Sequence, residues 1–319
     1  MSARRHRAIV AAVAVVTLAA VAVVALVAAS GKPGASPKPP GVAPAATSAF
    51  PAPPRGSLVF ARADRTDVLA IAILPQAHAL LVRTSVVGQQ GKGVRGLRVS
   101  LTARGDSAAR SGRASACGPG CYQAALALRS PPRALRVVVE RTSRTTTWDV
   151  RLPRAWPARD ASALIARATR VWNHLRSVSY VDRLSSGPAH TVVSRWRAVA
   201  PDRLAYRIQG GGGDAVIIGS RRWDRSQGGA WVRSPALRVH QPQPFWVAAV
   251  DAHVVGTGRI GVHPVWRVSF FDPRTRAWFL ASIDRATART LDVRMWATAH
   301  FMHDTYGQFD APLEIVPPA

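Results

Sequence analysis

Two cysteines stand close together in this 319-residue chain, in the segment Cys117-Gly-Pro-Gly-Cys121. The glycines and the proline can fold the chain back on itself and bring the two sulfur atoms within bonding reach. Outside the reducing cytoplasm, such a pair is expected to form a disulfide that pins a hairpin. The alternative is a soft-metal site, in which two thiolates and His78 would bind Cu(I) or zinc. The sequence favours the disulfide and predicts no metal site.

The other candidates for chemistry do not meet the requirements of a site. His300 and His303 could ligate one metal only on a helix, because residues three apart point to opposite faces of a strand. They are interpreted as a polar edge beside a core residue, Phe301. Two glycine-rich segments, 88–93 and 210–213, lack the Lys-Ser/Thr pair and the helix that follow a phosphate-binding loop. No nucleophile elbow, cysteine nucleophile or carboxylate pair in a plausible cleft is found, so we expect a protein that is not an enzyme and holds no cofactor.

The N-terminus has the features of an export signal. Several arginines precede an uncharged run, rich in Ala, Val and Leu, from Ala8 to Ala29. As a helix this run spans about 33 Å, enough to cross a hydrocarbon core of about 30 Å. Because basic residues stay on the cytoplasmic side, we expect residues 1–30 to form a cytoplasmic arm and a single-pass transmembrane helix, with the rest of the chain extracytoplasmic. A cleaved signal peptide is the alternative, since Val27-Ala28-Ala29 offers small residues for cleavage.

Residues 31–56 are predicted to be a linker. The segment is rich in proline, contains Gly, Ala and Ser, and has no acidic residue. Such a composition cannot bury enough apolar surface to form a core, and in polyproline II geometry it reaches up to roughly 75 Å. It would therefore hold the folded part of the chain away from the membrane.

The chain is strongly basic, with 43 Lys and Arg against 17 Asp and Glu and a formal net charge of +26. The positive charge is spread along the chain, and no zinc finger, RNA-recognition signature or basic zipper is present, so the sequence predicts no nucleic-acid partner. Two interpretations of the charge remain. It is either a general feature of the composition or a means of attraction to anionic lipid headgroups or cell-wall polymers.

Residues 57–153 show the period of two that is typical of β-strands. Leu69, Ile71 and Ile73 alternate with alanines, and a similar alternation recurs near 99–103. Short strands of this kind, separated by Gly- and Pro-containing turns, indicate an immunoglobulin-like β-sandwich.

The segment around the two cysteines resembles a known family. Cys117-Gly-Pro-Gly-Cys121-Tyr122, the run Ala125-Leu126-Ala127-Leu128 and the closing Trp148-Asp149-Val150 are similar to the extracytoplasmic tail domain of copper resistance D-type proteins. The resemblance implies a role in copper handling. The chain lacks the multi-helix membrane part and any His/Met-rich copper motif of that family.

Residues 155–319 begin with a predicted helix and continue with predicted strands. Asp160 can cap a helix that runs through about Ser177. Its apolar residues return on one face at helical spacing, and they are Ala161, Leu164, Ile165, Ala168, Trp172 and Leu175. After it the period is two, in extended pieces that end near 311–316. A sheet of that size bends, so we expect a mainly β fold, with an open half-barrel of antiparallel strands whose concave face is covered by the helix.

This order of elements resembles the LolA-like superfamily, which includes the LolA and LolB lipoprotein carriers and the lipoproteins LppX and LprG. The motifs that support the resemblance are Pro201-Asp202-Arg203-Leu204, Ile217-Ile218-Gly219 and the closing stretch from Trp278 to Met295. The resemblance implies an unclosed barrel with a hydrophobic cavity that accepts acyl chains. The chain has no cysteine for lipid attachment after its apolar run.

We expect eight residues to line that cavity. They are Leu164 and Trp172 on the helix, with Trp196, Tyr206, Trp266, Phe270, Trp278 and Met295 opposite them on the sheet. Alternation shows which residues of one strand share a face, whereas it does not show which face is the concave one.

The leading hypothesis is a membrane-anchored extracytoplasmic binding protein that holds a lipid, a lipoprotein acyl chain or another hydrophobic ligand in the half-barrel. The first alternative is an envelope-sensing or assembly protein whose groove receives a peptide or protein partner. The second is a copper-handling protein that acts through Cys117 and Cys121.

Overall fold

The computed structural model describes residues 52–64, 67–88, 92–106, 108–185, 191–226, 228–236, 242–297 and 300–319. The predicted transmembrane helix and most of the predicted linker lie outside these residues. Within the described ranges, no helix combines the length and the apolar character needed to span a membrane.

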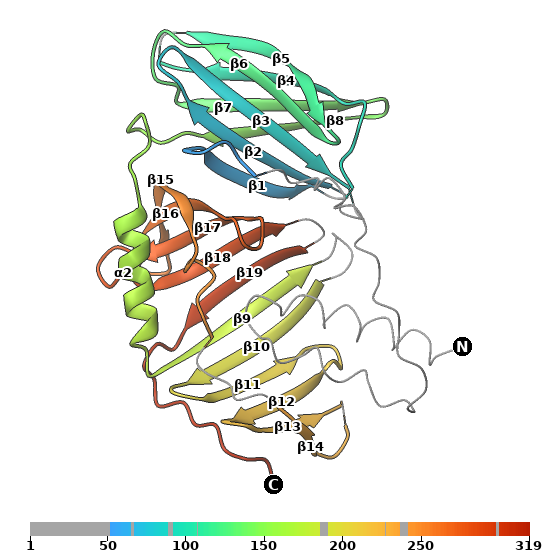
Figure 1. The fold of residues 1–319 in the computed structure, drawn as a ribbon, viewed down its shortest axis with the longest axis vertical. Helices are drawn as coiled ribbons and strands as arrows, with labels where there is room; N and C mark the ends of the chain where they lie inside the picture. The colour runs from blue at the N-terminus through green and yellow to red at the C-terminus, as the bar shows by residue number, and fades with distance from the viewer. Residues whose placement is uncertain are drawn as a thin grey trace, which may run out of the picture.

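Eight antiparallel strands form the first sheet, in the order β1-β2-β3-β6-β5-β4-β7-β8 (Figure 1). Their bounds are β1 Leu58–Asp64, β2 Asp67–Pro75, β3 Ala79–Val87, β4 Arg98–Arg104, β5 Ala109–Gly118, β6 Cys121–Ala127, β7 Ala134–Arg141 and β8 Arg144–Arg151. The first part of β5 pairs with β4 and its last part pairs with β6. Strands on the two sides of β5 share one apolar core, to which Ile71 and Leu80 contribute from one side and Leu101 and Leu135 from the other. The predicted alternation is thus confirmed as strands, and the immunoglobulin-like arrangement stays a prediction.

Eleven antiparallel strands form the second sheet, in the order β14-β13-β12-β11-β10-β9-β19-β18-β17-β16-β15. Their bounds are β9 Ser177–Ser185, β10 Thr191–Val199, β11 Arg203–Ile208, β12 Gly213–Ile218, β13 Arg221–Arg225, β14 Val232–Pro235, β15 Val250–Ile260, β16 His263–Asp272, β17 Ala277–Asp284, β18 Thr290–Ala297 and β19 His300–Gly307. The first and last strands of this set, β9 and β19, pair with each other in the middle of the sheet. One helix, α2, precedes them.

Helix α2 spans Ser162–Asn173 and ends about one turn before the predicted Ser177, because β9 already begins there. Asp160 lies next to its start and accepts hydrogen bonds from the backbone N–H and the hydroxyl of Ser162, at 3.2 and 2.8 Å. The predicted apolar stripe is buried at Ile165, Ala168 and Trp172.

The last strand is the largest departure from the sequence prediction. The segment 300–304 was expected to be a polar edge and 311–316 a final extended piece. In the structure, β19 is a central strand between β9 and β18, and residues 311–319 form no strand. The prediction was wrong because buried polar residues such as Asp304 interrupt the apolar alternation of β19.

We call the side of the eleven-stranded sheet that faces α2 the inner face, and the opposite side the outer face. A single cluster on the inner face joins α2 to strands on both sides of the centre, including Leu204 of β11 and Phe270 of β16. The sheet is therefore a curved half-barrel with the helix on its inner side. Figure 1 shows α2 beside β15–β18. On the outer face, β16–β18 pack against β1 and β2 of the first sheet.

Candidate functional site

Four aromatic side chains form a continuous row across the inner face. Tyr306 of β19, Tyr180 of β9, Trp196 of β10 and Tyr206 of β11 stand directly opposite one another in register. Residues that face each other across neighbouring strands point to the same side, so their rings meet. The centroids of successive rings lie 5.4, 5.7 and 4.5 Å apart. Tyr306 is buried, whereas the other three are half-buried and present an apolar surface.

Beneath α2 the row ends in a filled core. The Trp172 ring lies edge-on to Trp246 and Tyr306, at centroid distances of 5.4 and 5.3 Å. Its indole N–H donates to the carbonyl of Pro242 at 2.8 Å. Trp246, which is 1% exposed, comes from the segment before β15 and was not expected in the interior. The space directly below Trp172 is thus occupied by the protein's own side chains, and the half-buried apolar surface lies further along the row.

At its other end the row meets a buried charge. The Arg222 side chain of β13 donates to the hydroxyl of Tyr206 at 3.0 Å and to Asp224 at 2.7 Å. Burial opposes the charge of Arg222, but its hydrogen bonds with Asp224 and the neighbouring hydroxyl of Tyr206 outweigh burial and raise its pKa. A ligand that lies along the row would contact aromatic rings over most of its length and a fixed polar group of the protein at one end.

Two carboxyl groups lie side by side on the inner face, next to the aromatic row. Asp182 of β9 is the register partner of Asp304 of β19, which is 1% exposed. Burial raises the pKa of Asp182 to about 6, and burial together with the charge of Asp182 raises the pKa of Asp304 well above its usual range. Among the described residues, the Oδ1 atom of each carboxyl has no hydrogen-bond partner. Ionisation of both neighbouring buried carboxyls is disfavoured, and a proton on one of them would provide a donor for the other.

Hydrogen bonds tie the carboxyl pair to the aromatic row. The Tyr306 hydroxyl donates to Asp304 at 2.7 Å. The Trp196 indole N–H donates to the Ser194 hydroxyl at 2.7 Å, and that hydroxyl donates to Asp182 at 3.4 Å. The protonation of the pair is therefore connected to the position of two rings of the row. Sequence reasoning missed the pair because Asp182 and Asp304 are far apart in the chain, and it missed Tyr306 with strand β19.

The structure brings some of the predicted cavity residues together and separates others. Trp196 and Tyr206 are neighbours in the row, and Met295 and Leu164 are half-buried at the edge of the inner cluster. Phe270 is fully buried in the core, where it stacks on Phe279 with ring centroids 4.9 Å apart.

Trp266 lies away from the row and is half-buried. The guanidinium groups of Arg159 and Arg285 lie 5.5 and 4.4 Å from its ring centroid. Such cation–π contacts stabilise a half-buried ring without a ligand.

The placement of Trp278 on the concave face was wrong. Trp278 points to the outer face, where it packs with Phe271 and Trp296 against the first sheet. Alternation along β17 instead turns Phe279 inward. The sequence shows that these two neighbours face opposite sides, and only the curl of the sheet decides which side is which.

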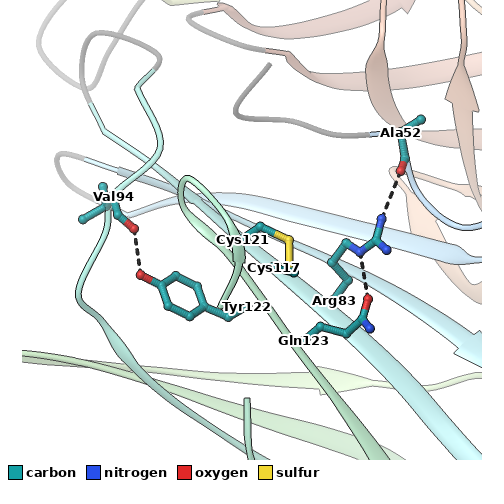
Figure 2. The surroundings of a disulfide bond; sticks show 7 residues. All are labelled: Ala52, Arg83, Val94, Cys117, Cys121, Tyr122 and Gln123. Carbon is teal, nitrogen blue, oxygen red and sulfur yellow. Dashed lines mark hydrogen bonds between the residues drawn. A yellow bond between two sulfur atoms is a disulfide. The ribbon is translucent and has the colours of Figure 1, made fainter. Parts of the chain in front are cut away.

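The two cysteines form the expected disulfide between the end of β5 and the start of β6 (Figure 2). The sulfurs are bonded to each other, so neither is a thiolate ligand. His78 precedes Ala79, which pairs with the far end of β6, so it lies about 20 Å along the strands from the disulfide at ~3.3 Å per residue. In the described part of the chain, no cluster of three or more His, Cys, Asp and Glu residues is arranged to hold a metal ion.

The surroundings of the disulfide are fixed by hydrogen bonds from both sides. The Tyr122 hydroxyl donates to the carbonyl of Val94 at 2.9 Å and accepts from the N–H of Leu97 at 3.0 Å. Arg83 donates to the side chain of Gln123 at 3.1 Å, and Figure 2 shows both residues beside the bridge. The bridge pins the β5–β6 hairpin, in which Cys121 is buried and Cys117 is exposed, and this is the structural role that the sequence favours.

Comparison with known proteins gives likenesses of fold alone. No protein-family model matches the chain, and no curated protein matches its sequence. Among solved structures, it is similar to the lipoprotein LppX of Mycobacterium tuberculosis, with 12% identity over 48% of this chain and 98% of that one and a TM-score of 0.38. It is also similar to LprF from Mycobacterium bovis, with 12% identity over 50% and 97% and a TM-score of 0.39.

A third similar structure is a LolA superfamily protein from Nitrosomonas europaea, with 9% identity over 50% of this chain and 96% of that one and a TM-score of 0.24. Each match spans nearly all of the other protein and about half of this chain. The resemblance of residues 57–153 to copper resistance proteins stays a prediction. The half-barrel rests on the strand order and on the inner cluster around α2.

Proposed function

We propose that this protein is an extracytoplasmic binding protein that holds a hydrophobic ligand against the inner face of its half-barrel. The observation that supports the proposal is the half-buried surface of Tyr180, Trp196 and Tyr206, which extends beyond the filled core beneath α2. Apolar surface arranged in a continuous row on a curved face is suited to an extended apolar group rather than to a compact polar one.

An acyl chain or a similar alkyl group fits this surface best. Each methylene removed from water contributes about 0.8 kcal/mol, so a chain that lies across three rings gains enough to bind without specific polar contacts. The buried Arg222 and the half-buried Asp224 at the far end of the row supply the polar groups that would orient the ligand. The ligand would thus be an amphiphile, with its alkyl part on the rings and its polar end toward β13.

The N-terminal sequence supports the proposed location. The apolar run from Ala8 to Ala29 behind several arginines supports a membrane tether with the two sheets outside the cell membrane. In that position the half-barrel would meet lipids or lipoproteins of the envelope.

The test is lipid extraction and mass spectrometry of the full-length chain purified from its own membrane. Wild-type protein is expected to carry a stoichiometric amphiphile. The double variant Trp196→Ala/Tyr206→Ala is expected to lose it while keeping its circular dichroism spectrum, because both rings are half-buried.

Trp223→Ala is the matched control. Trp223 is also a half-buried tryptophan of this sheet, but it belongs to the cluster on the outer face. The control is expected to keep the ligand. Wild-type protein that never carries an amphiphile, or equal loss in the control, would contradict the proposal, and a stoichiometric peptide in its place would favour an interaction protein.

A further inference from the structure

A groove of about 570 Å³ lies along β9–β12 and β19, and most of its lining side chains belong to the outer face of the half-barrel. The four residues of the aromatic row, whose side chains point to the inner face, also contribute to its lining. The residues of β10 and β11 that point into it are the outward neighbours of the row, Arg195, Arg197 and Arg207. Trp231, from the connection between β13 and β14, lines it as well. Its size falls within the range of small-molecule sites, about 300–1,000 Å³.

The charges in the groove are not balanced. Arg195, Arg207, Asp214 and Arg225 follow one another in register across four strands, from β10 to β13. Asp214 accepts hydrogen bonds from Arg207 at 2.8 Å and from Arg225 at 3.1 Å, so one carboxylate serves two arginines. Arg195 has no carboxylate partner among the described residues, and it stands directly opposite Arg207. Like charges in directly opposed positions destabilise a sheet unless an anion lies between them.

A second arginine beside Arg195 is also free to bind an anion. Arg197 is exposed, and the one hydrogen bond of its guanidinium within the described part of the chain is a long one, 3.4 Å, to the carbonyl of Glu314. The two residues are separated by one position of β10, so both side chains leave the same face about 7 Å apart. They form a pair of guanidinium groups on one side of the groove.

The rest of the groove is apolar. Ala205 and Val216 are buried at its base and belong to the cluster on the outer face, to which Trp231 is also joined. The guanidinium of Arg225 lies 4.6 Å from the Trp231 ring centroid, and this contact fixes the ring. The groove therefore combines two unpaired cations with an apolar base and an aromatic wall.

We propose that this outer groove binds a phosphate-bearing ligand, with the phosphate held between Arg195 and Arg197 and an adjoining ring or short apolar group on Ala205 and Val216 beside Trp231. Guanidinium groups match phosphate oxygens in paired hydrogen bonds, and a phosphate has enough acceptors for both arginines. The phosphate would contact outward side chains of β10, whereas the proposed function uses the inward rings of the aromatic row, so the two proposals rest on different side chains although row residues also line the groove.

The test is isothermal titration calorimetry of the full-length chain in a nonionic detergent at low salt. The probes are glycerol 3-phosphate, a short-chain phosphatidic acid below its micellar concentration, and a short-chain phosphatidylcholine as the zwitterionic comparison. Either phosphate monoester is expected to bind, with an affinity that falls as salt increases. Equal binding of the two indicates a free phosphorylated molecule, and tighter binding of the phosphatidic acid indicates a lipid headgroup.

The double variant Arg195→Gln/Arg197→Gln is expected to weaken binding by about tenfold or more, since two charge-assisted contacts are lost. The matched control is Arg110→Gln/Arg113→Gln on β5, which removes two exposed arginines of the first sheet and the same net charge. The control is expected to bind within about twofold of wild type, because neither Arg110 nor Arg113 lines the groove. No binding of either monoester, or equal weakening in the control, overturns the proposal.

Discussion

Strands β10 and β11 present opposite chemistry on the two faces of the half-barrel. On the inner face their side chains in the aromatic row are Trp196 and Tyr206, which are half-buried and in contact. On the outer face the next residues along β10 and β11 are Arg195 and Arg207, which are exposed. A period of two in the sequence thus encodes two surfaces at once, and a shift of one residue would exchange them.

The carboxylates show the same difference in their electrostatics. Burial raises the pKa of Asp182 on the inner face to about 6. On the outer face, burial also opposes ionisation of Asp214, but hydrogen bonds from Arg225 and Arg207 outweigh it and lower its pKa. Protonation is therefore favoured for Asp182 on the inner face and ionisation for Asp214 on the outer face, although both residues belong to one sheet. The following changes break or sharpen this difference.

The largest expected effect is the loss of a ring from the inner core. Trp172→Ala removes a side chain that is 5% exposed and contacts Trp246 and Tyr306, so it should lower the free energy of unfolding by about 3–5 kcal/mol. Trp223→Ala on the outer face should cost at most about 2 kcal/mol, since its ring is half-buried. Urea unfolding followed by circular dichroism measures both. Equal losses would show that the inner face is no better packed than the outer one.

The carboxyl pair should make stability depend on pH in an unusual direction. Because the pKa of Asp182 is raised to about 6, the folded state binds its proton more tightly than the unfolded state does. Its stabilising contribution is complete below about pH 4 and is lost as the pH rises through about 6, a change on the order of 3 kcal/mol. Asp182→Asn/Asp304→Asn should remove this dependence and be more stable than wild type at pH 8. Thermal unfolding at pH 5 and pH 8 tests it, and parallel curves for both proteins would contradict a shared proton.

A smaller effect is expected from the hydroxyl that binds this pair. Tyr306→Phe leaves a buried oxygen of Asp304 without its donor and should cost about 1–3 kcal/mol. Tyr206→Phe is the matched control, because its hydroxyl accepts from Arg222, which keeps Asp224 as a partner. The control should cost about 1 kcal/mol or less. If Tyr206→Phe proved the more costly change, the polar end of the row would matter more than the carboxyl pair.

The sequence predicted those features of the fold that depend on local periodicity. The stripe of α2 is buried at Ile165, Ala168 and Trp172 because helical spacing places them on one face whatever lies opposite. The alternation of the strands is equally local. In contrast, the orientation of Trp278 depends on the direction in which the sheet curls. The sequence of a single strand does not reveal that direction.

The candidate site was predictable only in part for a related reason. Trp196 and Tyr206 are on neighbouring strands and stand opposite each other in register, so their side chains point to the same face. Asp182 and Asp304 meet only because β19 returns to pair with β9. The polar residues of β19 break the apolar alternation, so the sequence did not predict that strand. Trp246 comes from an irregular segment before β15, where no period exists to indicate an inward side chain.

The smallest expected effect has the opposite sign of pH dependence and lies on the outer face. Asp214→Asn removes the carboxylate that Arg207 and Arg225 share, at a cost of about 1 kcal/mol or less at pH 7, because these pairs are partly exposed. The pKa of Asp214 is lowered, so its contribution is present above about pH 4 and disappears as the pH falls through its folded-state value. The free energies of unfolding of this variant and wild type should therefore converge in acid, whereas those of the inner carboxyl variant and wild type should diverge as the pH rises.

Asp214→Asn also leaves Arg195 and Arg207 opposed without a counter-charge, so phosphate should bind the outer groove more tightly in calorimetry. Weaker phosphate binding in this variant would mean that Asp214 positions the arginines rather than competing for them.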